Sequence, residues 1–180
     1  AVRVVRTPAA LGAVVMAPEL VTRIGRALAG GAPRILLAGA EGSGRGMLVE
    51  AQLAEHDRAV VRVDLAAIAA DAEMAERLAA ALREAALRDA CAILDGGSAL
   101  KDEIPRALAH AIAESASGLG VPLVFTLAVH PAWLAQAIPD LVEIDVPSPT
   151  FRERLELWQR ALPPPLAERA DLEIVASRYA

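Results

Sequence analysis

The sequence predicts an α/β fold, in which a five-stranded parallel sheet is covered by helices on both faces. Five short apolar or alternating runs are separated by segments with helical periodicity, which is the pattern of strands joined by crossover helices. Three runs are apolar throughout and two alternate, so the first kind should be central and the second should lie at the edges. With 55% hydrophobic residues, a chain of 180 residues can bury a good core.

The helices are predicted from apolar residues that recur every three or four positions and from the residues at their ends. Pro18 opens the first helix and a Gly-Gly pair ends it. Asp71, Asp102 and Ser148 are the expected N-caps of later helices. The helices are predicted over residues 18–29, 47–56, 72–88, 132–137, 148–162 and 171–179, and from Asp102 to beyond residue 112.

The strands divide by pattern into the two kinds. In the second strand, valines lie on one face while Arg62 and Asp64 lie on the other, which predicts one wet face. Cys91 stands in an apolar strand and is expected to be a buried small hydrophobe. The apolar strands are predicted over 35–38, 90–95 and 121–129, and the alternating strands over 59–65 and 141–146.

Three regions follow from this order of elements. Residues 1–16 show no sustained period and should form an N-terminal arm that lies extended against the main body. Residues 17–147 form the α/β domain, and residues 148–180 begin a small helical lid. A missing initiator Met and an abrupt end at Ala180 lead us to expect a piece of a longer protein.

Composition argues against several classes of partner. The net charge is −5 and the arginines are scattered among acidic residues, so no basic stripe favours nucleic acid. No apolar run approaches the roughly 18 to 20 residues that span a bilayer, so we expect no membrane partner. A single cysteine gives no disulfide framework, which fits a reducing, cytoplasmic compartment.

A glycine-rich loop between the first strand and its helix carries the main chemical signal. The spacing Gly39-x-x-x-x-Gly44 is that of the Walker A motif, in which backbone N–H groups and a helix N-terminus cradle phosphates. ATP or ADP is therefore the candidate ligand. The predicted nucleotide-binding residues are Gly39, Gly42, Ser43, Gly44, Arg45, Gly46 and Met47.

The end of the motif departs from its usual chemistry. Arg45 stands where a lysine reaches the terminal phosphates, and Gly46 stands where a Ser or Thr hydroxyl holds Mg²⁺. The chain has 17 arginines and one lysine, so compositional drift explains Arg45 but does not explain Gly46. Glu41 also places a carboxylate in the loop, where it repels a triphosphate unless it points outward. Binding of Mg²⁺ is therefore doubtful.

Asp95 stands at the end of an apolar strand, where a second carboxylate would orient Mg²⁺. The next residue, often an acid that polarises the attacking water, is Gly96. Two interpretations stay open: Asp95 as a metal ligand, and Asp95 as a strand-terminal residue that caps a turn.

The ordered motifs resemble the AAA+ ATPases over nearly the whole chain. The sheet order of that family, 5-1-4-3-2, agrees with the edge strands deduced above. More narrowly, the Gly-Ser-Gly-Arg loop, the Leu-Asp-Gly strand end and the Ala-Ser-Arg-Tyr close look like the first, degenerate AAA+ module of bacterial winged-helix ATPases, whose relatives are encoded with contractile injection systems. The motifs are a helix before the loop, the loop Gly39 to Gly46, Ile93-Leu94-Asp95, the strand and turn Val124 to Pro131, and residues 142–157.

Departures from the family bear on activity. The polar sensor residue expected after the fourth strand falls near Val129, where Thr126 and His130 are the polar candidates, and His130 is better explained as a helix cap or a solvated turn residue. Residues 133–141 contain no arginine finger. Loss of that finger alone costs roughly 10³ to 10⁵ in rate. The second sensor would lie beyond Ala180.

These departures favour a non-hydrolysing AAA+ module, with no catalytic residue of its own, that serves other AAA+ modules or protein subunits as a structural or regulatory partner. Two alternatives remain. One is a working ATPase in which Arg45 replaces lysine and a neighbouring subunit supplies the finger. The other is a protein-interaction module without nucleotide, in which Glu41 fills the phosphate site and pairs with Arg45.

Overall fold

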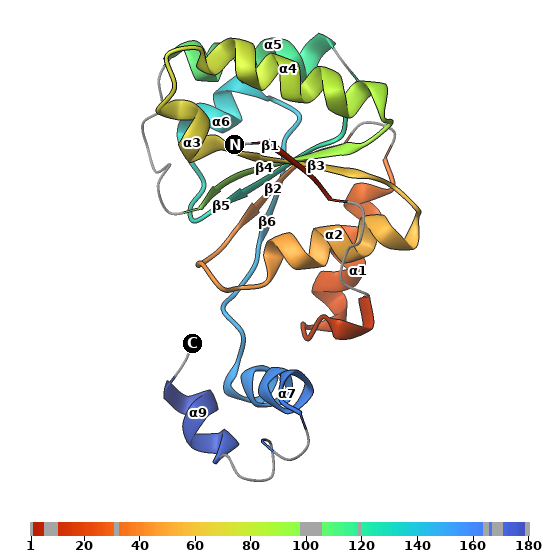
Figure 1. Cartoon of the computed structure of the whole chain (residues 1–180), viewed down its shortest axis with the longest axis vertical. Coiled ribbons are helices and arrows are strands. Elements are labelled where there is room, and N and C mark those ends of the chain that lie inside the picture. Colours follow the sequence, from red (N-terminus) through yellow and green to blue (C-terminus); the bar gives the residue numbers. More distant parts are fainter. Residues whose placement is uncertain are drawn as a thin grey trace.

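A six-stranded sheet lies at the centre of the computed structural model (Figure 1). The structure describes residues 2–5, 11–30, 33–97, 106–118, 120–163, 166 and 171–178. The strand order is β1-β3-β4-β5-β2-β6. The strands are β1 (Val2–Val5), β2 (Arg34–Ala38), β3 (Val60–Asp64), β4 (Cys91–Gly97), β5 (Leu123–Leu127) and β6 (Val142–Asp145).

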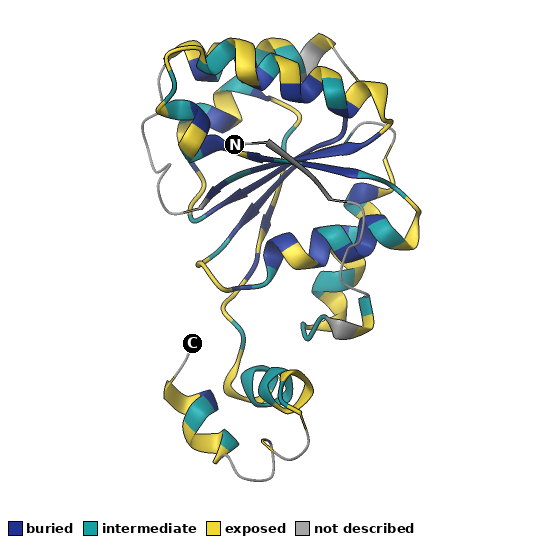
Figure 2. Cartoon of the chain, in the orientation of Figure 1, coloured by how far each residue is buried: buried dark blue, intermediate teal, exposed yellow. Residues whose placement is uncertain are grey.

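Five of these strands are parallel and confirm the predicted α/β sheet. Their order, β3-β4-β5-β2-β6, is the predicted order 5-1-4-3-2 read from the other edge, because β2 is the first predicted strand. The apolar strands β2, β4 and β5 are central and almost fully buried (Figure 2). A strand that is covered on both faces has no solvent side, so its sequence does not alternate.

The N-terminal arm adds a strand to the sheet. Strand β1 pairs antiparallel with β3, from Val2 opposite Val63 to Val5 opposite Val60. The prediction that the arm lies against the main body is therefore confirmed for residues 2–5, whereas the prediction that the second strand is a sheet edge is wrong. The polar residues of β3 have other roles: Arg62 lies against Gly46 of the glycine loop, and Asp64 caps helix α3.

Helices cover both faces of the sheet, as predicted (Figure 1). The short helix η1 and helices α1 and α2 lie on one face, and α3, α4, α5 and α6 lie on the other. The bounds are η1 (Leu11–Ala13), α1 (Pro18–Leu28), α2 (Arg45–Glu55), α3 (Leu65–Ala69), α4 (Met74–Leu87), α5 (Arg106–Gly118) and α6 (Ala132–Ala137).

Two apolar clusters fill the layers between sheet and helices. Phe125 is fully buried under α4 and α5, and Ile35 is fully buried under α1 and α2. Cys91 belongs to the second cluster and has no exposed surface, which confirms that it is a buried hydrophobe. Burial raises the pKa of its thiol to about 12, so Cys91 stays protonated at neutral pH.

Several helix ends differ from the predictions because of local hydrogen bonds. Helix α4 begins at Met74 and not at residue 72, since Asp71 Oδ1 accepts a bond from the Glu73 N–H and its carboxylate pairs with Arg77. Helix α3 was not predicted; Asp64 caps it by accepting a bond from the Ala67 N–H at 2.9 Å. The expected cap Asp102 lies outside the described residues.

Within its described residues, the predicted lid includes helices α7 (Phe151–Ala161) and α9 (Leu172–Arg178), which pack on each other below the sheet in Figure 1. No residue of α7 is buried (Figure 2). Thr150 is the N-cap of α7 and forms a capping box with Glu153, so the prediction of Ser148 as the cap is wrong. Within the described part of the chain, no helix is long and apolar enough to cross a membrane.

Candidate functional site

The glycine loop joins the end of β2 to the start of α2, as a phosphate-binding loop does (Figure 1). Gly42 and Gly44 have φ angles of 82° and 79°, a backbone region in which a side chain is strained. Helix α2 begins at Arg45, two residues earlier than predicted. Its first-turn N–H groups have no acceptors within the helix and carry partial positive charge, so this end of the loop favours an anion.

Gly39 fixes the start of the loop between two strands. Its N–H donates to the carbonyl oxygen of Leu127 at 3.0 Å, and a Cβ at this position would lie 2.3 Å from the carbonyl oxygen of Val146. Only a residue without a side chain fits between the ends of β5 and β6. Gly39 therefore has a structural role at the mouth of the loop, and its N–H is already engaged.

Arg45 turns its guanidinium back into the loop. Its Nη1 donates to the carbonyl oxygens of Gly39 and Ala40, both at 2.5 Å, and lies 3.4 Å from Ser43 Oγ. The residue is only 7% exposed. Among the ion pairs of the described residues none involves Arg45, and its Nε is buried without a hydrogen-bond partner. The loop thus holds a buried cation without a counter-charge.

Glu41 does not supply that counter-charge. It is exposed in the turn of the loop, while Arg45 bonds to the loop carbonyls. The alternative in which Glu41 fills the phosphate site by pairing with Arg45 is therefore not what the structure has. A carboxylate that points outward also adds no negative charge of its own to the interior of the loop.

A second arginine, Arg62 of β3, lies beside the first turn of α2. Its Nη1 donates to Glu50 Oε1 at 2.7 Å, and its Nη2 donates to Asp95 Oδ2 at 3.0 Å. Because these partners come from α2 and β4, the guanidinium ties three elements together. Asp95, the predicted metal ligand, is thus one of the carboxylates that hold Arg62.

Gly46 lies against the guanidinium of Arg62, which occupies the space beside its Cα. A Cβ at Gly46 would lie 2.6 Å from Arg62 Nη2, so a side chain there would require the end of the Arg62 side chain to move from its present position. The guanidinium therefore fills the space that a Ser or Thr side chain would use in a Walker A motif. Gly46 and Arg62 are sterically matched to each other.

The residues present do not fit Mg²⁺ at this loop. A P-loop holds the ion between the hydroxyl of the residue after the lysine and the aspartate of a neighbouring strand. Here position 46 has no hydroxyl, and Asp95 is bonded to Arg62, whose Nη2 lies against Gly46. Among the described residues, no group of three or more His, Cys, Asp or Glu side chains is arranged to hold a metal ion.

The two sensor candidates occupy different environments. Thr126 is 1% exposed, pairs in register with Asp95, and its Oγ1 has no hydrogen-bond partner in the described structure. His130, in the turn after β5, bonds Glu143 through Nδ1 and Asp145 through Nε2. His130 therefore joins β5 to β6 and is neither a helix cap nor a free turn residue.

Sequence reasoning missed two residues of the site, Arg62 and Glu50. The alternating pattern of β3 predicted that Arg62 lies on a face exposed to solvent. In the structure this face lies beneath α2, where Arg62 pairs with Glu50. Of the predicted binding residues, Ser43 is buried in the loop, whereas the Met47 side chain is 37% exposed. Their contact with a nucleotide stays a prediction.

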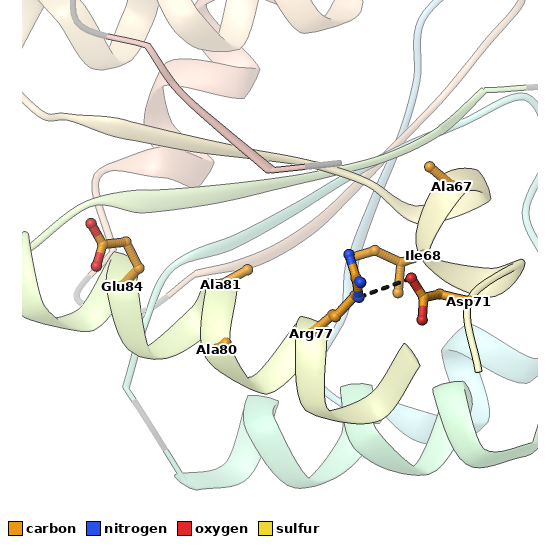
Figure 3. Close-up of a pocket in the computed structure, with 7 residues that line it drawn as sticks. All are labelled: Ala67, Ile68, Asp71, Arg77, Ala80, Ala81 and Glu84. Atoms are coloured by element: carbon orange, nitrogen blue, oxygen red, sulfur yellow. Dashed lines mark ion pairs between the residues drawn. The ribbon is translucent and has the colours of Figure 1, made fainter. Parts of the chain in front are cut away.

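A cavity lies away from the loop, between α3 and α4 (Figure 3). Its volume is about 470 Å³, and its walls are mainly Ala and Ile side chains. Arg77 at its rim is paired with Asp71 at 2.8 Å. No pair of side chains with acid–base or nucleophilic chemistry converges there among the residues that line it, so the loop is the better candidate for a functional site.

No protein-family model matches this sequence, and no curated protein matches it. The features that bear on function are therefore the glycine loop after β2, its residue Arg45, and the contact of Arg62 on β3 with Asp95 on β4.

Proposed function

We propose that this chain is a non-hydrolysing P-loop module of the AAA+ type, which serves another protein module as a structural or regulatory partner. The parallel sheet, the strand order and the two-helix lid support this type of module. The partner would contact the sheet domain and the lid helices.

The observation that carries the proposal is the ion-pair network of Arg62. Hydrolysis by a P-loop needs a metal ion, a positioned water and stabilisation of the charge on the transferred phosphoryl group. Arg62 lies at the metal position and engages Asp95, and Gly96 follows Asp95 in place of an acid. The residues on which turnover depends are thus replaced or already bonded.

A second candidate function, binding of ATP or ADP without turnover, is favoured by Arg45. A buried guanidinium without a carboxylate partner costs free energy, and a phosphate is a suitable counter-charge. Left-handed Gly42 and Gly44 and the start of α2 supply backbone donors at the same loop.

Two measurements on the same protein test these functions. Phosphate release from ATP with Mg²⁺ should not exceed that of a sample without protein, because Asp95 and position 46 offer no metal site. Titration calorimetry with ATP and ADP, each with Mg²⁺ and with EDTA, should give binding that does not depend on Mg²⁺. The variant Arg45→Ala should lose that binding, since it removes the buried cation.

The results of the turnover and binding measurements each reject a different candidate function. Mg²⁺-dependent ATP turnover that Asp95→Asn abolishes would contradict a non-hydrolysing module. Absence of binding up to millimolar ATP and ADP would reject the second candidate and leave the protein-partner role, which pull-down with a neighbouring AAA+ module would then test.

A further inference from the structure

We infer that the Arg62 guanidinium is a built-in replacement for the divalent cation of the loop, so that the protein itself holds no metal ion there and needs none to bind a phosphate ligand. The ligand part of this inference rests on the nucleotide binding proposed above. The exclusion of metal does not, because it concerns only residues of this chain.

Arg62 Nη2 lies between the two positions from which a P-loop holds its metal ion. The two protein groups that hold Mg²⁺ in a P-loop come from the first turn of the loop helix and from the end of a neighbouring strand. Arg62 Nη2 lies at the corresponding two places, 2.6 Å from a Cβ built on Gly46 and 3.0 Å from Asp95 Oδ2. A positive charge thus already stands between the two positions.

Two ion pairs hold the positive charge of Arg62 in place. Arg62 is held by two carboxylates from different elements, and the Glu50 side chain is only 13% exposed. A guanidinium offers donors in a rigid fork and keeps its charge at any physiological pH. Entry of a second cation would require Arg62 to leave both carboxylates, and it would be repelled as long as Arg62 remained.

Gly46 and Arg62 also restrict each other sterically. Any side chain at position 46, a metal-binding hydroxyl included, would contact Arg62. Gly46 and Arg62 therefore fit each other: the absence of a side chain at position 46 leaves room for the guanidinium that takes the place of the metal.

Binding of Mn²⁺ alone, measured by electron paramagnetic resonance, tests the exclusion of metal without any nucleotide. The unaltered chain should leave added Mn²⁺ free. Arg62→Ser should bind Mn²⁺ at least about tenfold more tightly, because the positive charge of Arg62 is then removed from beside Glu50 and Asp95. Arg62→Lys keeps a charge and should bind as little as the unaltered chain, while Arg62→Ser combined with Asp95→Asn should lose the gained site.

A second variant and a coupling measurement guard against misfolding. If Arg62→Ser fails to fold, Arg62→Gln, which keeps hydrogen-bonding groups but no charge, should show the same gain. Gly46→Ser should destabilise the unaltered chain and should be tolerated in the Arg62→Ser background, where it should also strengthen Mn²⁺ binding.

Two results would overturn the inference: Mn²⁺ binding by the unaltered chain that Asp95→Asn abolishes, or folded Arg62→Ser and Arg62→Gln proteins that bind no more Mn²⁺ than the unaltered chain. An absence of nucleotide binding would instead reject the nucleotide-binding candidate and the ligand part of this inference, and it would leave the Mn²⁺ result unchanged. Mg²⁺-dependent ATP turnover that Asp95→Asn abolishes would contradict both the non-hydrolysing function and the exclusion of metal.

Discussion

Gly39 shows how strongly one residue can be constrained by the ends of two strands. A methyl group at this position would overlap the carbonyl oxygen of Val146, which is backbone and cannot rotate away. We expect Gly39→Ala to lower the free energy of unfolding by about 2 kcal/mol, the usual scale of overpacking. Urea denaturation would measure the change.

Gly118 provides the matched control for that substitution. It is exposed at the end of α5, and a Cβ there would meet no atom within 4 Å. Gly118→Ala should therefore change the free energy of unfolding by less than about 0.5 kcal/mol. Equal effects of the two substitutions would contradict the packing of Val146 against Gly39.

His130 should make stability depend on pH. Its hydrogen bond with Asp145 is the main cause that raises its pKa above the ordinary value of about 6.5; partial burial opposes this shift, and the bond with Glu143 adds to it. Because the folded state favours the protonated ring, the added stability is fully present below about pH 6.5 and is lost as pH rises through the raised pKa.

Replacing the ring by an amide tests this dependence. The difference in unfolding free energy between the unaltered chain and His130→Asn should be larger at about pH 6 than at about pH 9. Asp145→Asn, which removes the main cause of the raised pKa, should reduce the same pH dependence. A difference that stays constant with pH would contradict the assignment.

Among the elements, α7 allows a direct test of a corrected prediction. Thr150 and not Ser148 caps the helix, and Thr150 exchanges reciprocal hydrogen bonds with Glu153. Thr150→Ala should cost about 1 kcal/mol of local stability, so amide hydrogen exchange in α7 should be roughly fivefold faster. Ser148→Ala, at an exposed position two residues earlier, should leave exchange in α7 unchanged.

The elements also show what sequence patterns can and cannot predict. The bounds of α6 are those predicted, because Pro131 before it and the break after Ala137 are local signals. Helix α3 was missed, since five residues are too few to show a helical period and its cap is the last residue of β3. The pairing of β1 with β3 was not predictable, because it joins segments about sixty residues apart.

At the scale of the whole molecule, hydrophobic pattern predicted which strands are central, whereas the full strand order was an expectation from the AAA+ resemblance. Strands covered on both faces are apolar throughout, and this separates β2, β4 and β5 from the others. The site was only half predictable. The glycine loop is local and carries its own spacing, whereas Arg62 meets Asp95 across 33 positions, and no local pattern reveals such a contact.

The approach of Gly39 to Val146 has a mechanical consequence. Val146 is followed by Pro147-Ser148-Pro149, a stretch in which two rings fix the backbone φ angle, and Thr150 then starts α7. The N–H of Val146 also donates to the carbonyl oxygen of Ala38, so the base of the glycine loop and the start of the 147–149 stretch are held together. We therefore expect a displacement of the loop backbone at Gly39 to be passed on to the α7–α9 pair, and a partner bound to that pair to act on the loop in return.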